Sequence, residues 1–513
     1  MAAAMIHNVH VAILVAAAAT AVLVVKSQAA RRIFDAILNA IVSRICFIPS
    51  VENGKNIKGP AYTFPDGQMK DKFFRGREMS YAWSEKYGSI YRIWAGSTPE
   101  VVLTDPKDVQ ALYSHASNHT KDTTANIGWL FSQLLGQAVG LINGNRWTKL
   151  RKTLDPLFSH KQSLQYIDDF NTSAACYAKS LDQYALEKRE ADEDDGHFVV
   201  NASQALMRFP YYEVAKLFYS NLTQYEIDRL WELGQLFTEV FAGAMDGGIN
   251  RSPLTKLLNR PSWQRTRSYI EQWEAFTHES VKRRVDAGIN DPLVSLWQQA
   301  AEEEIDRQEV LHTLAESLFA NLDVTTHVIS SCVILLADNP TVQADLRAEF
   351  SRHAYDVVGY LGRRDTLLHF CLLESLRLQP VPAFTLPDKP PRERIIGGYR
   401  IPKDTTILID SYAINIRNPF WGPDSRRYRP NRFASIPSQQ LRYNLTTFGY
   451  GSRKCLGYNV GDKMVHALVY QLFSQYDVSI RPDMKKKGDE QFKRDGGNWL
   501  ALYDVELNVK RRV

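Results

Sequence analysis

The stretch Phe448-Gly-Tyr-Gly-Ser-Arg-Lys-Cys-Leu-Gly457 places one cysteine, Cys455, among glycines and basic residues. Gly451 allows a tight turn and lets the backbone come close to a flat ligand. A helix-forming run follows, and a helix N-terminus together with the two basic residues before the cysteine favours the thiolate. A thiolate serves as a nucleophile or as an axial metal ligand, whereas a buried free thiol, the commonest role of a single cysteine, fits poorly with polar surroundings. The sequence therefore predicts that the chemistry centres on Cys455.

The rest of the chain has an ordinary composition for a globular protein. It has 513 residues, 44% hydrophobic and 23% charged, with a formal charge of +5. These values exclude collagen, a disordered tail and a polytopic membrane protein, and the small charge does not indicate nucleic acid as a partner. The five cysteines are widely spread and form no Cys-x-x-Cys pair, which indicates a reducing compartment. With neither repeat nor linker after the first 70 residues, we expect one large, mainly α domain with small β-sheets.

The N-terminus contains an apolar run over residues 11–25, interrupted only by Thr20. With its upstream apolar neighbours the run reaches the roughly 20 residues that span a bilayer, and basic residues follow it. A cleaved signal peptide, the alternative, carries its positive charges before the run. We therefore expect a single-pass membrane anchor over 1–26, a linker over 27–70 and a cytosolic catalytic domain over 71–513.

The cysteine stretch resembles the haem-binding loop of the cytochrome P450 family, Phe-x-x-Gly-x-Arg-x-Cys-x-Gly. All fixed positions of the pattern match, at Phe448, Gly451, Arg453, Cys455 and Gly457. The resemblance implies a haem b cofactor whose iron takes Cys455 as its fifth, thiolate ligand. It also implies that Phe448 shields the thiolate and that Arg453 meets a haem propionate. Electron donation from such a sulfur favours O–O cleavage.

A second motif lies in the helical segment that contains Glu374-Ser-Leu-Arg377. The i, i+3 spacing places Glu374 and Arg377 on one helical face, and their apolar neighbours indicate a buried pair rather than a surface pair. Tyr428-Arg-Pro-Asn-Arg-Phe433 resembles the family's Phe-x-Pro-x-Arg-Phe element, which makes Arg432 the third member. By this resemblance the triad has a structural role.

Two further observations concern the haem propionates. Trp147 and Arg151 resemble the family's Trp-x-x-x-Arg helix and would hold a propionate together, although a core tryptophan beside a surface arginine explains the same spacing. Family members often carry another arginine or histidine after a Pro-rich turn, but residues 381–387 contain neither. One anchor is therefore absent or supplied from elsewhere.

The segment from about 309 to 336 is predicted to be a long buried helix, because Asp323 is its only charged residue between Glu316 and Asp338. Within it, Ala320-Asn-Leu-Asp-Val-Thr-Thr326 departs from the family pattern Ala/Gly-Gly-x-Asp/Glu-Thr-Thr. We expect Asp323 and Thr325, in preference to Thr326, to relay protons across a local bulge. The alternative is a bent core helix whose hydroxyls bond to the backbone.

As a whole, the sequence is similar to membrane-bound eukaryotic cytochromes P450. The resemblance implies an endoplasmic-reticulum monooxygenase that uses O2 and NADPH electrons delivered by NADPH–cytochrome P450 reductase, with cytochrome b5 as a further donor. No P-loop or dinucleotide fingerprint is present, so the electrons come from a partner. The chain looks like filamentous-fungal members that tailor natural products, including peptide-derived and diketopiperazine metabolites. A reductase-independent haem-thiolate isomerase or dehydratase and a non-enzymatic haem sensor or scaffold are the alternatives.

Overall fold

Helices form most of the protein in this computed structural model, which describes residues 28–114, 119–188, 196–484, 492 and 503–512. The predicted anchor over 1–26 lies outside the described residues. The helices are α2 (Gln28–Ile45), α3 (Met69–Phe74), α4 (Gly76–Tyr87), α5 (Pro106–Tyr113), α6 (Trp129–Leu135), α7 (Gly144–Phe158), α8 (His160–Gln165), α9 (Ile167–Lys179), α10 (Ala202–Leu206), α11 (Arg208–Phe218), α12 (Gln224–Met245), α13 (Thr255–Leu258), α14 (Arg260–Asp286), α15 (Pro292–Ala301), α16 (Arg307–Ala320), α17 (Thr326–Ala337), α18 (Pro340–Arg352), α19 (Val357–Gly362), α20 (Leu367–Leu378), α21 (Ser438–Asn444) and α22 (Tyr458–Gln475). This content confirms the predicted mainly α class.

Three small sheets accompany the helices. The first has the order β1 (Ile90–Ala95), β2 (Thr98–Leu103), β7 (Thr406–Ile409), the second has the order β3 (Ala185–Lys188), β4 (His197–Asn201), β9 (Glu506–Arg511), β8 (Tyr476–Ile480), and the third pairs β5 (Arg394–Ile396) with β6 (Tyr399–Ile401). In the first sheet Ala95 pairs with Thr98, so β1 and β2 form a hairpin around a Gly-Ser turn. Strand β7 then joins β2 in parallel, although some 300 residues separate them.

The central helix forms from three consecutive pieces: α16, the π-helical segment η4 (Asn321–Thr325) and α17. It begins with a capping box, in which Asp306 accepts from the start of the helix and Glu309 accepts from the backbone of Asp306. Within the described part of the chain, Arg307–Ala337 is the one helix long and apolar enough to cross a membrane, but 72% of its apolar window is buried in the protein. It is therefore a core helix, as its lack of charge predicts.

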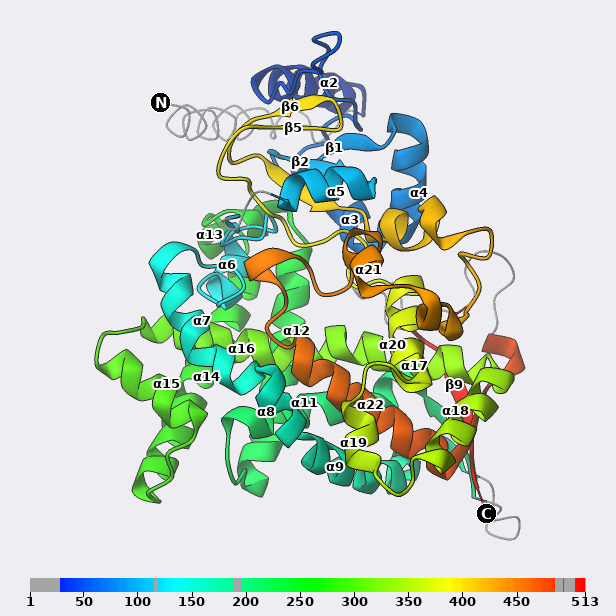
Figure 1. The fold of residues 1–513 in the computed structure, drawn as a ribbon. Coiled ribbons are helices and arrows are strands. Elements are labelled where there is room, and N and C mark those ends of the chain that lie inside the picture. Colours follow the sequence, from blue (N-terminus) through cyan, green and yellow to red (C-terminus); the bar gives the residue numbers. More distant parts are fainter. Residues whose placement is uncertain (1–27, 115–118, 189–195, 485–491, 493–502, 513) are drawn as a thin grey trace.

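The first sheet and the main group of helices occupy different ends of the molecule. Figure 1 shows α2 and the β1–β2–β7 sheet at one end of the molecule, with the helices at the other and α16 and α17 across the middle. Helix α2 falls in the stretch predicted as a linker. Its Leu38 and Val42 pack against Tyr62 and Trp94, so this stretch is attached to the sheet. Helix α22, predicted after Gly457, packs on α9 and α20 in the main core.

Candidate functional site

The cysteine loop is a narrow hairpin closed by its own backbone. The Cys455 N–H donates to the carbonyl of Phe448 at 2.8 Å, and helix α22 begins three residues later. Gly449 and Gly451 have φ of +76° and +65°, a region that other residues rarely adopt, which explains the two glycines before the cysteine. The Phe448 ring packs edge-on against Tyr458, with ring centroids 4.9 Å apart. The loop therefore holds the cysteine at a fixed point ahead of α22.

The thiol of Cys455 is exposed and forms no disulfide. Burial by the surrounding protein nevertheless raises its pKa, against the lowering effects of the Gly457 N–H, Arg151 and Lys454. The Cys455 side chain is thus accessible and at the same time surrounded by protein. Both observations hold if its sulfur faces an interior space. The sequence predicts from the neighbouring charges that the thiolate is favoured, but desolvation of the sulfur outweighs those charges. Binding to a metal would supply the missing stabilisation of the thiolate.

The central helix has one residue, Glu316, that acts electrostatically on Cys455. Most of its side chains are buried, but one face is partly accessible, formed by Glu316, Ser317, Ala320, Asp323, Val324 and Thr325. We call these residues the accessible face. The charge of Glu316 raises the pKa of Cys455, which places the carboxylate within electrostatic reach of the thiol. The start of the accessible face and the cysteine loop, far apart in sequence, therefore come near each other in the fold.

The π-helical segment η4 determines where the predicted relay residues lie. The hydroxyl of Thr325 donates to the Asn321 side-chain carbonyl at 2.6 Å, whereas the hydroxyl of Thr326 donates to the Asn321 backbone carbonyl at 2.9 Å. Asp323 accepts from the Val324 N–H at 2.9 Å and, like Thr325, is partly accessible, while Thr326 is buried. The local bulge is present. Asn321, the residue in the place of the family's glycine, joins the site as a partner of both threonines.

Positive charge borders the cysteine loop on the side of α7. Arg453 donates to the carbonyls of Ile142 and Gly140 at 2.9 and 3.1 Å and lies over the Trp147 ring at 4.7 Å. Arg151 pairs with Asp155 at 2.6 Å and donates to the Lys454 carbonyl at 3.2 Å. Burial lowers the pKa of Arg453 to about 10. The three residues predicted to hold propionates are thus brought together.

The predicted triad is assembled in the core. Glu374 binds the guanidinium of Arg377 at 2.7 Å and that of Arg432 at 3.0 Å, and all three side chains are buried. Arg377 also donates to the carbonyls of Asn415 and Ser425. These bonds tie α20 to the segment before the cysteine loop, so the polar groups are satisfied and the loop gains a rigid support.

A second polar cluster, which the sequence does not reveal, lies near the loop. Asp388, just after the Pro-rich turn, pairs with Lys121 at 2.8 Å, accepts from the Tyr113 hydroxyl at 2.7 Å and influences the pKa of Arg453. His119 is buried beside Tyr113, and its Nε2 has no hydrogen-bond partner among the described residues. These residues come from segments about 270 positions apart, so only the fold could reveal the cluster. It places a lysine and a histidine close to where the sequence lacks an anchor.

The residues present fit a haem. Nowhere in the described ranges do three or more His, Cys, Asp or Glu side chains converge as a metal site. A single cysteine can therefore hold iron only if other ligands come with the metal, as in a porphyrin. The accessible thiol, the glycine turn, the orphaned Nε2 of His119 and the arginines beside Trp147 match a flat ligand that carries carboxylates.

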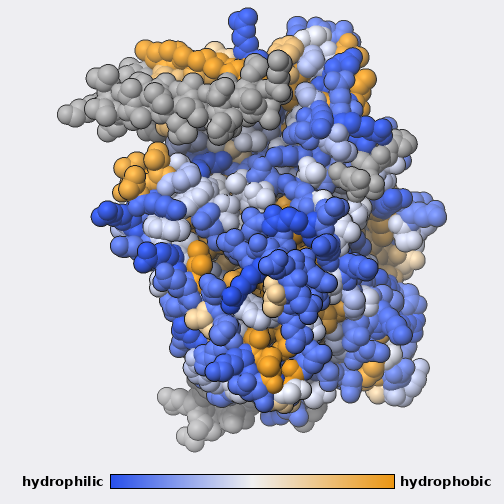
Figure 2. Space-filling model, turned by 90° about the vertical axis from the view of Figure 1, so that its left-hand side faces the viewer, coloured by the Kyte–Doolittle hydropathy of each residue, from blue (hydrophilic) through white to orange (hydrophobic). Residues whose placement is uncertain are grey.

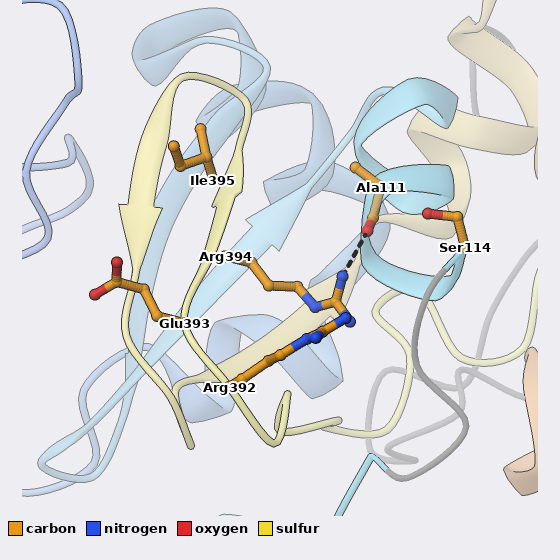
Figure 3. A pocket seen from close by; sticks show the side chains of 6 residues that line it. All are labelled: Ala111, Ser114, Arg392, Glu393, Arg394 and Ile395. Atoms are coloured by element: carbon orange, nitrogen blue, oxygen red, sulfur yellow. Dashed lines mark hydrogen bonds between the residues drawn. The ribbon is translucent and has the colours of Figure 1, made fainter.

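A surface pocket lies beside the His119 cluster, since Arg394 in its lining influences the pKa of His119. Figure 3 shows its lining residues, among them Arg394, whose guanidinium donates to the Ala111 carbonyl at 3.4 Å. It has a volume of about 470 Å³, opens widely to solvent and includes no residue of the cysteine loop or the central helix. We therefore do not consider it the catalytic site.

Comparisons with known proteins identify the family. The family model described as Cytochrome P450 matches residues 75–496. The cytochrome P450 monooxygenase hasH of Aspergillus fumigatus is 51% identical over 495 residues, which cover 94% of this chain and 90% of that protein. The cytochrome P450 monooxygenase sirC of Leptosphaeria maculans is 37% identical, covering 90% and 89% of the two chains, and gliC of Aspergillus fumigatus is 34% identical, covering 89% of each.

Proposed function

The chain belongs to the cytochrome P450 family and is a monooxygenase, and from this premise we propose that Cys455 holds the iron of a haem b at which a small organic substrate is oxidised. We further propose a role in fungal natural-product biosynthesis, with peptide- or diketopiperazine-derived metabolites as the substrate class. The observation that carries the proposal is the accessible Cys455 thiol, enclosed in a glycine hairpin and bordered by the accessible face of the central helix. The haem, when bound, supplies the activation of O2 and the transfer of one oxygen atom.

The protein's own residues position the cofactor. In the proposal, Phe448 covers one side of the sulfur, and the Gly457 N–H, which lowers the pKa of Cys455, donates toward it. Arg453 and Arg151, with Trp147 beneath Arg453, bind the carboxylates of the haem. The triad Glu374–Arg377–Arg432 keeps the loop in place from behind.

Proton delivery is proposed to occur at η4. Asp323 and Thr325 are the acid and the alcohol that are partly accessible from the interior space, and a π-helical turn leaves room for water between them. Asp323 takes up a proton from water, and Thr325 Oγ1 passes it toward the substrate side. Asn321 fixes the orientation of that hydroxyl through its 2.6 Å bond.

A partner must supply electrons, and we propose an NADPH–cytochrome P450 reductase. Exposed cations lie on the elements beside the cysteine loop, at Lys149 and Lys152 of α7 and Arg442 of α21. An acidic surface would dock there by electrostatic attraction. Cytochrome b5 is a further acidic electron donor that this surface would accept.

We also propose that the protein is held at the endoplasmic-reticulum membrane with its catalytic domain in the cytosol. Helix α2 exposes an isoleucine at every fourth position, Ile33, Ile37, Ile41 and Ile45, which are 44–61% exposed. Leu257 and Leu258 of α13 are 68% and 70% exposed. Figure 2 shows hydrophobic residues gathered along the upper end of the molecule, where Figure 1 places α2. An apolar surface of this kind suits a bilayer, and it lies next to where the predicted anchor joins the domain.

The test is a spectrum followed by a turnover assay. Full-length protein in microsomes, reduced and treated with CO, should show the red-shifted Soret band of thiolate ligation, and Cys455→Ala should lose it. Product formation from a candidate substrate should then depend on NADPH and reductase. An unchanged band in the alanine variant would refute Cys455 as the ligand, and turnover with hydroperoxide alone would indicate an isomerase or dehydratase instead.

A further inference from the structure

Glu316 is an acid in the core for which the reaction itself gives no role. It lies on α16 at the start of the accessible face, and one of its carboxylate oxygens accepts the Gly140 N–H at 3.1 Å. A side chain at position 140 would collide with this carboxylate, because a Cβ there would be 2.2 Å from Oε1. The absence of a side chain at Gly140 therefore leaves room for the carboxylate, and the hydrogen bond from the Gly140 N–H fixes its position.

The carboxylate has no counter-ion within the part of the chain that the structure describes. Arg453 is the nearest cation that influences it, but its Nη atoms donate to the carbonyls of Ile142 and Gly140. On its own helix, His312 accepts the Gln137 N–H and has a pKa lowered to about 4 by burial, so it is neutral, and Glu309 pairs with Arg146. The charged groups that face Glu316 are thus Arg453 and the Cys455 thiol from the loop, and neither binds it directly.

The position of Glu316 separates it from the proton relay. Glu316 and Asp323 are seven positions apart in the helix, which is about 10 Å along the axis. A group so far from η4 does not complete that relay, but its charge acts on Cys455. A carboxylate that is largely removed from bulk water and has no counter-ion is costly unless another group binds it.

We propose that Glu316 binds a hydrogen-bond-donating nitrogen of the substrate, an ammonium or an amide N–H, and thereby decides which part of the substrate is presented to the haem iron. This inference rests on the proposed function, because it assigns a substrate class to the same site. Burial raises the pKa of Glu316 to about 7, so the group is mainly ionised at pH 8. A charge-assisted hydrogen bond to nitrogen would return the free energy of interaction that the group lost on leaving water.

Three imidazoles that differ only in their tails provide the test: 1-butylimidazole, 1-(3-aminopropyl)imidazole and 3-(imidazol-1-yl)propanamide. Each is titrated into the ferric full-length protein at pH 8, and the shift of the Soret band gives Kd. In each protein, the Kd of the butyl compound divided by the Kd of a compound with a nitrogen-bearing tail measures the preference for nitrogen. For at least one of the two nitrogen-bearing tails, we expect this ratio to be roughly tenfold larger in the wild type than in Glu316→Gln. Preference for the ammonium would indicate cationic substrates, and preference for the amide would indicate neutral ones.

Two further variants make the result specific. Gly140→Ala places a methyl group where the Glu316 carboxylate lies and should displace the carboxylate. This variant should lose the same preference as Glu316→Gln. Glu302→Gln, an exposed acid just before α16, removes a charge without touching the interior and should keep the preference. If all variants show a normal thiolate CO band and equal relative affinities for the three tails, the inference is refuted while the proposed function stands. Loss of the band in the wild type would instead refute the proposed function.

Discussion

At the scale of residues, Arg453 shows how one side chain can serve both the fold and the cofactor. An arginine has five N–H donors, and the carbonyls of Ile142 and Gly140 fix two of its nitrogens. Trp147 supports the flat guanidinium from below at 4.7 Å. Because its orientation is set before any ligand arrives, little side-chain entropy remains to be lost when a haem carboxylate binds.

The triad gives the first prediction. Glu374→Gln keeps the size of the side chain but leaves Arg377 and Arg432 buried without a carboxylate, which we expect to cost about 3–5 kcal/mol of unfolding free energy. Denaturant unfolding followed by circular dichroism and by haem absorbance measures the loss. Glu393→Gln, which removes an exposed pair with Arg400, should change stability by less than about 1 kcal/mol. Equal effects of the two variants would show that burial of the triad is unimportant.

The two threonines give the second prediction. Thr325→Val should raise the hydrogen peroxide formed per NADPH consumed several-fold, because it removes the accessible hydroxyl that we propose delivers protons. Thr326→Val should leave this ratio nearly unchanged, because the Thr326 hydroxyl is buried and bonded to the Asn321 carbonyl. The ratio is measured with reductase and a turned-over substrate. An increase confined to Thr326→Val would assign the relay to the other hydroxyl.

At the scale of elements, a pair of buried histidines joins α19, α20 and α22. His466 Nδ1 lies 3.0 Å from the Leu361 carbonyl and donates to it, so its Nε2 accepts from His369 Nδ1 at 3.1 Å. Burial lowers the pKa of both imidazoles, and the repulsion between them lowers that of His369 further. Both rings are therefore neutral in the folded protein.

The histidine pair predicts acid sensitivity. A base whose pKa is lower in the folded than in the unfolded state contributes stability above its unfolded pKa of about 6.5, and that stability is lost as the pH falls below it. We expect the unfolding free energy to decrease by about 5 kcal/mol between pH 7 and pH 4.5, roughly half of it from each imidazole. In His369→Gln the amide can still donate to His466 but does not titrate, so the decrease should be shallower. Parallel curves for wild type and variant, measured by urea unfolding across this range, would contradict the assignment.

Elements also show what the sequence could and could not predict. The β1–β2 hairpin, the central helix and α22 follow from periodicity, turn residues and the absence of charge, and the structure confirms them. The bulge at 320–326 was expected from a mismatch with the family pattern, but the role of Asn321 was not, because it depends on the exact path of η4. The raised pKa of Cys455 was also missed, since the sequence shows neighbouring charges but not the desolvation that outweighs them.

At the scale of the whole molecule, the groups that need distant segments to meet could not be predicted. Lys121 and Asp388 pair across 267 positions, and the parallel β2–β7 pairing brings their segments together. No local pattern indicates such a pair. The composition did indicate one body in place of several domains, and the main core, which extends from α6 to β9, is consistent with that.

The distribution of charge on the whole surface gives the last prediction. Lys149, Lys152 and Arg442 are exposed on elements that flank the cysteine loop, so electrons from an acidic partner would travel a short path to the site. Reversing all three to glutamate should raise the KM for reductase about tenfold at low salt and flatten its dependence on ionic strength, because steering between exposed charges is screened by salt. The matched control reverses Lys179, Lys282 and Arg260, exposed cations on α9 and α14, and should leave this KM within about twofold. The imidazole Kd and the CO spectrum should stay unchanged in both variants, since no interior residue is altered. An equal rise of KM in the control would mean that net charge, and not a docking surface around the loop, governs reduction.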